Sequence, residues 1–352
     1  MEFGVTASQI DEIGFVTHAE NLGYSFCWVY DSQFLASDPW AVLALLAQQT
    51  RTMAIGTGVA VPGLRLAPVT ANGIATINRL APGRAFLGLG TGNTAMRTLG
   101  QRPMPVAEFA EYLRVVRGLL NGDEVQYTLR GTTHTVQFQN VDRGYLDLAP
   151  RIPIHVGGFG PKAQALAGEW GDGLITGFPR GGSITSARAN ARSGADRVGR
   201  AFSGFRIFAL MNLLMLEPGE SLTSARVIEE CGSSIMANVH YLVDLHRETE
   251  APPPDYVLPI WDDYLAFHRT RDQARSHLEM HRSHYAFLDP DEARFVTPEM
   301  IRNFTLCGQP DEIADRIRAL EAEGLNGMVF ALAPDQQYRV IEDFARRVMP
   351  LL

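Results

Sequence analysis

The alternation of strand-like and helix-like segments constrains the fold of this chain more than any other feature. The apolar segment FGVT is followed by SQIDEIGFVTHAENLG, in which Ile10, Ile13 and Val16 recur near helical spacing. The strand-like segments SFCWVYD, MAIGTGVAV and RAFLGLGTG are each followed by helix-like sequence too, so four strand–helix units are complete by residue 122. Such regular alternation is typical of a parallel sheet covered by helices.

The alternation resumes in the second half of the chain after one interruption. Residues 123–150 alternate polar and apolar side chains around Gly131, which predicts an inserted β-hairpin. The segments IPIHVGG, GLITG and FRIFALMNLLML then each precede helical sequence, and NGMVFAL supplies an eighth strand before a closing helix. Residues 251–304, rich in Pro, His and aromatic side chains, are interpreted as a second insertion or lid over the site.

Eight strand–helix units predict an α/β fold, a (β/α)8 TIM barrel with the inserted hairpin and a C-terminal-half insertion or lid. A length of 352 residues suits one barrel of this kind. Because no linker separates two halves, residues 1–352 are expected to form a single domain.

Charge and composition exclude several classes of function. The net charge of -8, without a cluster of Lys and Arg, disfavours a nucleic-acid partner. The three cysteines Cys27, Cys231 and Cys307 have no C-x-x-C spacing and are expected to be core thiols. The longest apolar stretch, IFALMNLLML, is about half of a membrane span, and the N-terminal segment is unlike a secretion signal. A cytoplasmic protein without membrane partners is therefore expected.

The glycine-rich segment FLGLGTGNTA has the spacing of a dinucleotide-binding fingerprint at Gly90, Gly92 and Ala95. It falls in the fourth strand–helix unit, however, and no acidic residue ends a strand about twenty positions later, so a Rossmann dehydrogenase is disfavoured. As a barrel strand, the segment makes Gly88 a small packing residue and places Gly90 and Asn93 at the end where barrel active sites form. Bare backbone there is expected to let a flat ligand approach closely.

Three long segments carry a resemblance to a known family. IGTGVAVPGLRLAPVTANGIATINRLAPGRAFLGLGTGNTAMRTLG resembles the third and fourth units of the bacterial luciferase-like family. HVGGFGPKAQALAGEWGDGLITG is similar to its fifth and sixth units, and FTLCGQPDEIADRIRALEAEGLNGMVF to its last. The family contains reduced-flavin-dependent monooxygenases and deazaflavin-dependent reductases and dehydrogenases. The resemblance implies a TIM barrel whose open end binds a flavin-type ring.

The resemblance also implies positions for the cofactor. A non-prolyl cis peptide behind the ring would fall at Gly58 and Val59, and phosphate binding would fall after the fifth and sixth strands. Three further residues, Thr6, Gly90 and Asn93, stand at the ends of the first and fourth strands. The full set expected to bind the cofactor is Thr6, Gly58, Val59, Gly90, Asn93, Gly157, Gly158, Gly177 and Arg180.

Three residues are candidates for catalysis. Asp31 ends the second strand, where a carboxylate has a functional interpretation at least as strong as a structural one. His240 and His284 are candidates for polar contacts in a substrate pocket.

Other conspicuous side chains have structural explanations of equal or greater weight. Asp38 and Trp40 are as consistent with a helix cap and first-turn packing as with a site, and Trp28 is interpreted as core. His277 and His281 have the spacing of two ligands on one helix face, but no third ligand is evident and no metal site is expected.

The main functional expectation is a monooxygenase that uses reduced FMN and O2 on a small organic substrate, with FMN supplied by a separate flavin reductase. The first alternative is a reductase or dehydrogenase that transfers hydride with the deazaflavin coenzyme F-420. Deazaflavin-dependent members often carry a histidine near the second strand, whereas DSQFLASDPW supplies Trp40 and none. The second alternative is a non-catalytic flavin-binding relative. The resemblance further implies a homodimer or homotetramer.

Overall fold

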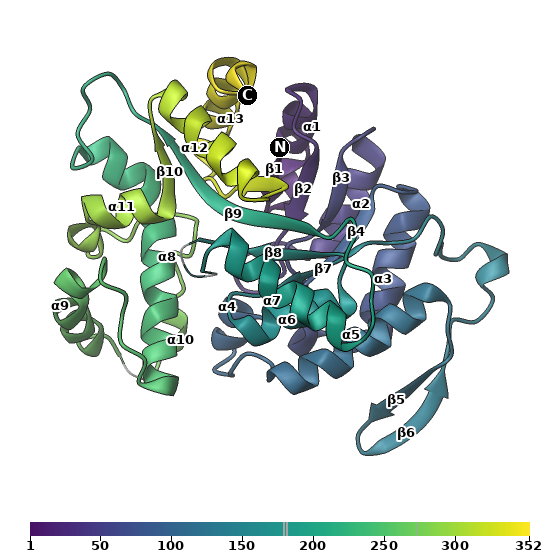
Figure 1. The fold of residues 1–352 in the computed structure, drawn as a ribbon. Coiled ribbons are helices and arrows are strands. Elements are labelled where there is room, and N and C mark those ends of the chain that lie inside the picture. The colour runs from purple at the N-terminus through teal and green to yellow at the C-terminus, as the bar shows by residue number, and fades with distance from the viewer. Residues whose placement is uncertain (179, 181, 273) are drawn as a thin grey trace. The chain divides into compact units, whose positions relative to one another are not determined.

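The computed structural model describes residues 1–178, 180, 182–272 and 274–352 (Figure 1). The chain forms two compact units. The first unit comprises Met1–Met96, Arg102–Ala209 and Glu323–Val329, and the second comprises Arg97–Gln101, Leu210–Ala322 and Phe330–Leu352. The sequence predicts one domain with insertions, so the grouping into two units is a difference. Its physical reason is that the segment after residue 209 has a hydrophobic core of its own.

Eight parallel strands close into the expected barrel, because the last of them lies between β9 and β1. In barrel order they are β1 (Glu2–Ala7), β2 (Phe26–Val29), β3 (Ala54–Thr57), β4 (Ala85–Leu89), β7 (Ile154–Gly157), β8 (Gly173–Thr176), β9 (Arg206–Met215) and β11 (Gly327–Phe330). The eight strand positions predicted from the alternation are therefore confirmed. The division between the two units falls inside β9 and β11.

Helices follow the barrel strands of the first unit, as the alternation predicts. They are α1 (Ile13–Asn21), α2 (Pro39–Gln49), α3 (Ala67–Leu80), α4 (Asn93–Arg97), α5 (Val106–Asn121), α6 (Pro161–Trp170) and α7 (Ile184–Arg197), with short 3-10 turns η1 (Ile10–Glu12), η2 (Pro62–Leu64) and η3 (Val141–Arg143).

The predicted hairpin is present between α5 and β7. Strands β5 (Val125–Leu129) and β6 (Thr132–Val136) pair antiparallel, with Val125 opposite Val136. Arg130 and Gly131 join them, both with positive φ angles of 53° and 80°. Two such residues match a two-residue hairpin turn. In Figure 1 the hairpin extends away from the strands of the barrel.

Near the amino-terminal ends of the strands, the barrel interior is filled by aromatic and imidazole rings, and these rings face glycines on neighbouring strands. His155 of β7 lies between Phe86 of β4 and Phe208 of β9, with ring centroids 5.2 Å and 4.8 Å away. A Cβ atom on Gly56 would lie 2.2 Å from the carbonyl oxygen of Phe86, and one on Gly88 would lie 2.0 Å from that of Thr57. The interpretation of Gly88 as a packing residue is confirmed, because no side chain fits there.

The second unit is mostly helical and includes the predicted insertion. Its elements besides the ends of β9 and β11 are α8 (Ala225–Thr249), α9 (Leu258–Arg269), α10 (Ser276–Glu279), η4 (Ala293–Phe295), α11 (Pro298–Phe304), β10 (Thr305–Gly308), α12 (Pro310–Ala322), α13 (Gln337–Arg347) and η5 (Met349–Leu351). The strand β10 is not among the expected strands. It pairs in parallel with the later half of β9, with Thr305 opposite Asn212.

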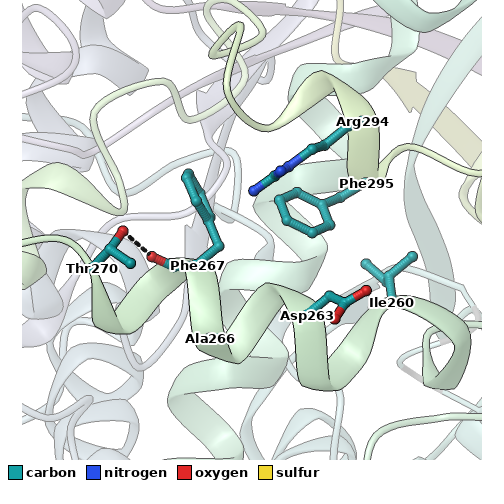
Figure 2. A pocket seen from close by; sticks show the side chains of 7 residues that line it. All are labelled: Ile260, Asp263, Ala266, Phe267, Thr270, Arg294 and Phe295. Carbon is teal, nitrogen blue, oxygen red and sulfur yellow. Dashed lines mark hydrogen bonds between the residues drawn. The ribbon is translucent and has the colours of Figure 1, made fainter.

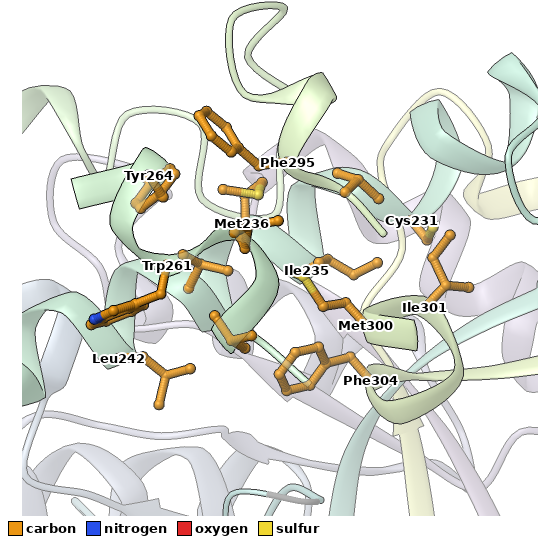
Figure 3. Close-up of a cluster of buried hydrophobic side chains, with 14 of the residues drawn as sticks. Cys231, Ile235, Met236, Leu242, Trp261, Tyr264, Phe295, Met300, Ile301 and Phe304 are labelled. Atoms are coloured by element: carbon orange, nitrogen blue, oxygen red, sulfur yellow. The ribbon is translucent and has the colours of Figure 1, made fainter. Parts of the chain in front are cut away.

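A hydrophobic core holds α8, α9 and α11 together. Met236 of α8, Tyr264 of α9 and Met300 of α11 are fully buried members of this cluster (Figure 3). Together they explain why the segment is an ordered unit rather than a loop. None of the described helices is both long enough and apolar enough to cross a membrane.

Candidate functional site

The expected cofactor residues of the first unit stand at the carboxyl ends of the barrel strands. Side chains alternate between the two faces of a strand, so residues two apart share a face. Gly58 shares the inner face with Gly56, Gly90 with Gly88, and Gly157 with His155. By the same alternation Thr6 and Gly177 end the inner rows of β1 and β8.

The peptide bond between Gly58 and Val59 is cis, as the family resemblance implies. On its two sides, the chain bonds to the neighbouring strands: before it, the Gly58 amide donates to the Val29 carbonyl at 2.9 Å, and after it, the Ala60 amide donates to the Gly88 carbonyl at 2.8 Å. The Gly90 amide in turn donates to the Ala60 carbonyl at 3.1 Å. The segment after β3 is therefore fixed between β2 and β4.

The Val59 side chain occupies the space that two glycines leave. A Cβ atom on Gly90 would lie 2.6 Å from Val59 Cγ2, and one on Gly157 would lie 3.2 Å from Val59 Cγ1. Bare backbone at Gly90 was expected to make room for a flat ligand, and this expectation needs correction. The space beside Gly90 receives Val59, so the glycine determines where the cis peptide can sit.

Gly92 has a second conformational role in the same glycine-rich segment. Its φ angle is +82°, a backbone conformation that L-residues with a side chain rarely adopt. A Cβ atom at this position would also lie 2.2 Å from Val61 Cγ1. Asn93 follows it as the first residue of α4. The spacing that imitates a dinucleotide fingerprint thus comes from close packing of β4 against the segment after β3.

Asp31 is engaged in an ion pair. Its carboxylate accepts hydrogen bonds from the Val61 amide at 2.9 Å and from Arg65 Nη1 at 2.7 Å and 2.8 Å. Only 2% of the Asp31 side chain is exposed. Because both partners belong to the segment after β3, Asp31 ties the end of β2 to the residues that follow the cis peptide.

Asp38 extends this link and begins α2. Its Oδ1 accepts from the amides of Trp40 and Ala41 at 3.0 Å and 3.2 Å, and its Oδ2 accepts from Arg65 Nη2 at 2.8 Å. The guanidinium carbon of Arg65 also lies 5.9 Å from the centre of the Trp40 ring. The helix-cap interpretation of Asp38 is therefore confirmed. Trp28 is buried, as the core interpretation expects.

Three of the residues expected to bind phosphate, Gly157, Gly158 and Arg180, lie near the start of α6. The Gly158 amide donates to the Ile175 carbonyl at 2.9 Å, and a Cβ atom on Gly158 would lie 2.8 Å from that of Ala163. Gly160 is the N-cap of α6 and offers no capping side chain. The guanidinium carbon of Arg180 lies 4.2 Å from the centre of the Phe159 ring, just before the helix.

Lys162 adds a second cation at this end of α6. It lies exposed in the first turn of the helix, where the helix dipole disfavours positive charge. Two cations beside the first-turn amides of a helix are suited to an anionic group. The donor set therefore fits the phosphate of a flavin-type cofactor.

The histidines expected to be catalytic belong to the second unit. His240 on α8 is 0% exposed, and its Nε2 lies 3.0 Å from Glu292, which also accepts from the Tyr264 hydroxyl at 2.8 Å. No surface of His240 is open to a substrate, so its position differs from the expected one. The half-buried ring of His284 lies 6.2 Å from that of His281.

His281 and His277 do not come together as ligands on a metal. His281 is buried, and its Nε2 lies 3.1 Å from the Asp244 carboxylate, which also pairs with Arg97 at 3.1 Å. In the described part of the chain, no group of three His, Cys, Asp or Glu side chains is arranged to hold a metal ion.

The structure places Arg65 and Lys162 beside the candidate site, and sequence reasoning does not identify them there. Arg65 lies 34 positions from its partner Asp31, and no periodic pattern joins them. Lys162 carries a local signal, because the first turn of a helix is an unfavourable place for the positive charge of a lysine.

The family model for luciferase-like monooxygenases matches residues 5–327. A 5,10-methylenetetrahydromethanopterin reductase of Archaeoglobus fulgidus is 26% identical over 346 residues, which cover 96% of this chain and 94% of that protein. An F420-dependent glucose-6-phosphate dehydrogenase of Segniliparus rotundus is 25% identical over 331 residues, which cover 89% of this chain and 84% of that protein.

The same barrel occurs in solved structures. The coenzyme F420 dependent tetrahydromethanopterin reductase of Methanopyrus kandleri matches with a TM-score of 0.71 at 21% identity, over 99% of both chains. A monooxygenase of Streptomyces bottropensis and the oxygenating constituent of a Pseudomonas putida 3,6-diketocamphane monooxygenase, in complex with FMN, also match, at lower TM-scores and identities. At these identities the likeness shows the fold alone.

Proposed function

The chain belongs to the luciferase-like monooxygenase family, and we propose that within it this oxidoreductase transfers hydride between coenzyme F-420 and a small organic substrate. The observation that carries the proposal is the match to an F420-dependent dehydrogenase along 89% of the chain. This reverses the order of the two cofactor hypotheses. Use of reduced FMN with O2 becomes the alternative, since a monooxygenase structure in complex with FMN supports it through the fold only.

The barrel mouth offers a support for the cofactor ring. When bound, coenzyme F-420 supplies a deazaflavin ring that accepts or donates a hydride. The cis peptide between Gly58 and Val59 would stand behind that ring, and the packing of Val59 against Gly90 and Gly157 would hold the support in place. Such prior placement lowers the entropic cost of binding.

The start of α6 would hold the cofactor phosphate. The amides of its first turn, Lys162 and the Arg180 guanidinium offer hydrogen bonds and positive charge on one side of the mouth. Because Arg180 stacks on Phe159, part of its conformational freedom is already lost before an anion binds.

Asp31 has a supporting role in this proposal. Its carboxylate is already shared between Arg65 and the Val61 amide, so it is a positioning residue for the segment after the cis peptide. The proposal therefore assigns it no proton transfer.

The two cofactor hypotheses can be separated by titration of the purified protein. Cofactor fluorescence would be followed as coenzyme F-420 and FMN are added in parallel, and oxygen uptake would be measured with reduced FMN. We expect saturable binding of coenzyme F-420 and no oxygen uptake above the protein-free rate. Saturable FMN binding with oxygen uptake, and no binding of coenzyme F-420, would overturn the proposal.

A pair of arginine variants tests the proposed phosphate contact. Arg180→Gln is expected to weaken coenzyme F-420 binding by about tenfold to a hundredfold, since a hydrogen bond to a charged group contributes about 1.5–3 kcal/mol. Arg192→Gln is the matched control, because Arg192 also stacks on a phenylalanine, with its guanidinium carbon 4.6 Å from the Phe202 ring centre. Equal losses in the two variants would point to a general charge effect and remove Arg180 from the site.

A further inference from the structure

The second unit contains a pocket of about 720 Å³ that the proposed function does not use. One side is a face of α9, on which Ile260, Asp263 and Phe267 recur every three or four residues (Figure 2). The other side is η4, which contributes Arg294 and Phe295. A volume of this size falls within the usual range of small-molecule sites.

The floor of the pocket is apolar. Ile260 and Phe295 are buried members of the hydrophobic core of the second unit, and Phe267 packs against that core. The pocket therefore lies on the outer side of the core, where the half-buried Phe267 offers an apolar ring surface. A ligand with an aliphatic or aromatic body would remove this surface from water.

Arg294 places a cation over the floor. Its guanidinium carbon lies 4.7 Å from the ring centre of Phe295 and 5.4 Å from that of Phe267. Among the residues that the structure describes, the guanidinium has no hydrogen-bond or ion-pair partner. The two rings hold it in place, and its donors are available to a carboxylate.

Asp263 places an anion in the same pocket. It precedes Phe267 by one turn of α9, or about 6 Å along a helix axis. Within the described ranges its carboxylate accepts no hydrogen bond and forms no ion pair. The Thr270 hydroxyl, by contrast, is occupied, because it donates to the Phe267 carbonyl at 2.6 Å (Figure 2).

We propose that this pocket binds a free α-amino acid with an apolar side chain. Asp263 would accept hydrogen bonds from the ammonium group, Arg294 would donate to the carboxylate, and the side chain would lie on Phe267 and Phe295. The opposite charges of Asp263 and Arg294 line one pocket without pairing with each other. Because both side chains line the same pocket, the two charged ends of one amino acid would have a partner each.

Ligands with a single charge fit the pocket less well. An apolar carboxylate would pair with Arg294 but would bring its negative charge near an uncompensated Asp263. An apolar amine would pair with Asp263 but would bring its positive charge near an uncompensated Arg294. Each would leave one pocket charge partly desolvated and without a partner, which disfavours binding.

Calorimetric titration of the full-length protein tests this inference, with L-leucine and L-phenylalanine as probes. The single-charge comparison ligands are 3-phenylpropanoate and phenethylamine, and glycine tests the need for an apolar body. We expect saturable binding of both probes and binding at least about tenfold weaker for each comparison ligand. The titration needs no cofactor, so its failure would leave the proposed function intact.

Variants of the two charged residues complete the test. Asp263→Asn and Arg294→Gln are each expected to weaken L-phenylalanine binding by about tenfold or more. Both side chains are exposed, so neither change leaves a cavity in the core. The matched controls are Asp262→Asn on the same helix and Arg302→Gln on α11, which are exposed and outside the pocket. We expect them to change the dissociation constant by less than about twofold.

Three results would overturn the proposal. The first is that neither probe binds saturably up to its solubility limit. The second is that 3-phenylpropanoate binds as tightly as L-phenylalanine, which would indicate a simple anion site. The third is that the pocket variants and their controls lose affinity equally.

Discussion

Asp31 illustrates how a single carboxylate at the end of a barrel strand can organise a neighbouring loop. Removing its charge with Asp31→Asn is expected to cost about 2–4 kcal/mol of unfolding free energy, because Arg65 loses its buried partner. Urea denaturation at neutral pH measures this cost. Coenzyme affinity should also fall, since the carboxylate holds the Val61 amide next to the cis peptide segment.

The control for this prediction is Asp38→Asn. The Asp38 side chain is 56% exposed and bonds to the other nitrogen of the same guanidinium. We expect that variant to cost about 1 kcal/mol or less. A loss as large as that of Asp31→Asn would contradict the dominant role of the buried pair.

The stability of the fold is also expected to depend on the fit between Gly90 and Val59. Gly90→Ala places a Cβ atom 2.6 Å from Val59 Cγ2, so Val59 must shift, at a cost of about 1–3 kcal/mol. The double variant Gly90→Ala with Val59→Ala is expected to recover part of the lost stability, because the smaller side chain makes room. Thermal unfolding of the single and double variants measures the coupling. Strictly additive losses would show that the two residues act independently.

At the scale of elements, the ring layer inside the barrel makes stability depend on pH. Burial of His155 between β4 and β9 lowers its pKa to about 4. Its unfolded value is about 6.5, so the unfolded chain binds more protons below that pH. The stabilisation is thus present above pH 6.5 and is lost as the pH falls toward 4, by about 3 kcal/mol in total.

Urea denaturation at pH 7 and pH 5 measures this pH dependence. In His155→Phe, which keeps a ring between Phe86 and Phe208, the difference between the two pH values should become smaller. The remaining dependence is expected to come from groups such as His268, whose burial also lowers its pKa to about 4. An unchanged pH dependence in the variant would contradict the assignment to His155.

The elements of the first unit were predictable because each leaves a local pattern. Strand and helix periods alternate up to β8, and polar alternation around Gly131 marks the hairpin. The strand β10 has only four residues and directly follows α11, so no period reveals it. Its existence depends on pairing with β9, which is a tertiary interaction.

Predictability of the candidate site follows the same division. The ends of strands mark Gly58, Gly90 and Gly157, because barrel ligands bind there. The partner of Asp31 and the burial of His240 depend on contacts between residues 34 and 52 positions apart, respectively. Side-chain type alone therefore made His240 a reasonable candidate, and only the position of Glu292 shows it to be enclosed.

For the whole molecule, the two units predict separate responses to core damage. Met300 is fully buried in the second unit, and Met300→Ala is expected to lose about 2–5 kcal/mol. Hydrogen exchange should then become faster at residues 210–215 and 305–308, which belong to the second unit. Residues 173–176 and 206–209, in the first unit, should change less.

Met53→Ala provides the reciprocal variant. Met53 is also fully buried, but it belongs to the first unit, so the pattern of faster exchange should be reversed. Equal acceleration of both halves of β9 in both variants would mean that the two units open together.

The continuity of β9 has a consequence for how such a molecule can be recombined. Its first residues, Arg206–Ala209, complete the barrel, whereas Asn212–Met215 carry the pairing with β10. A splice after Ala209 and a second before Glu323 would exchange Leu210–Ala322, the largest segment of the second unit, and would leave β11 with the barrel. In such chimaeras β9 would be the point at which a helical segment from another protein is joined to the barrel. The pocket proposed to bind an amino acid would be transferred with the exchanged segment.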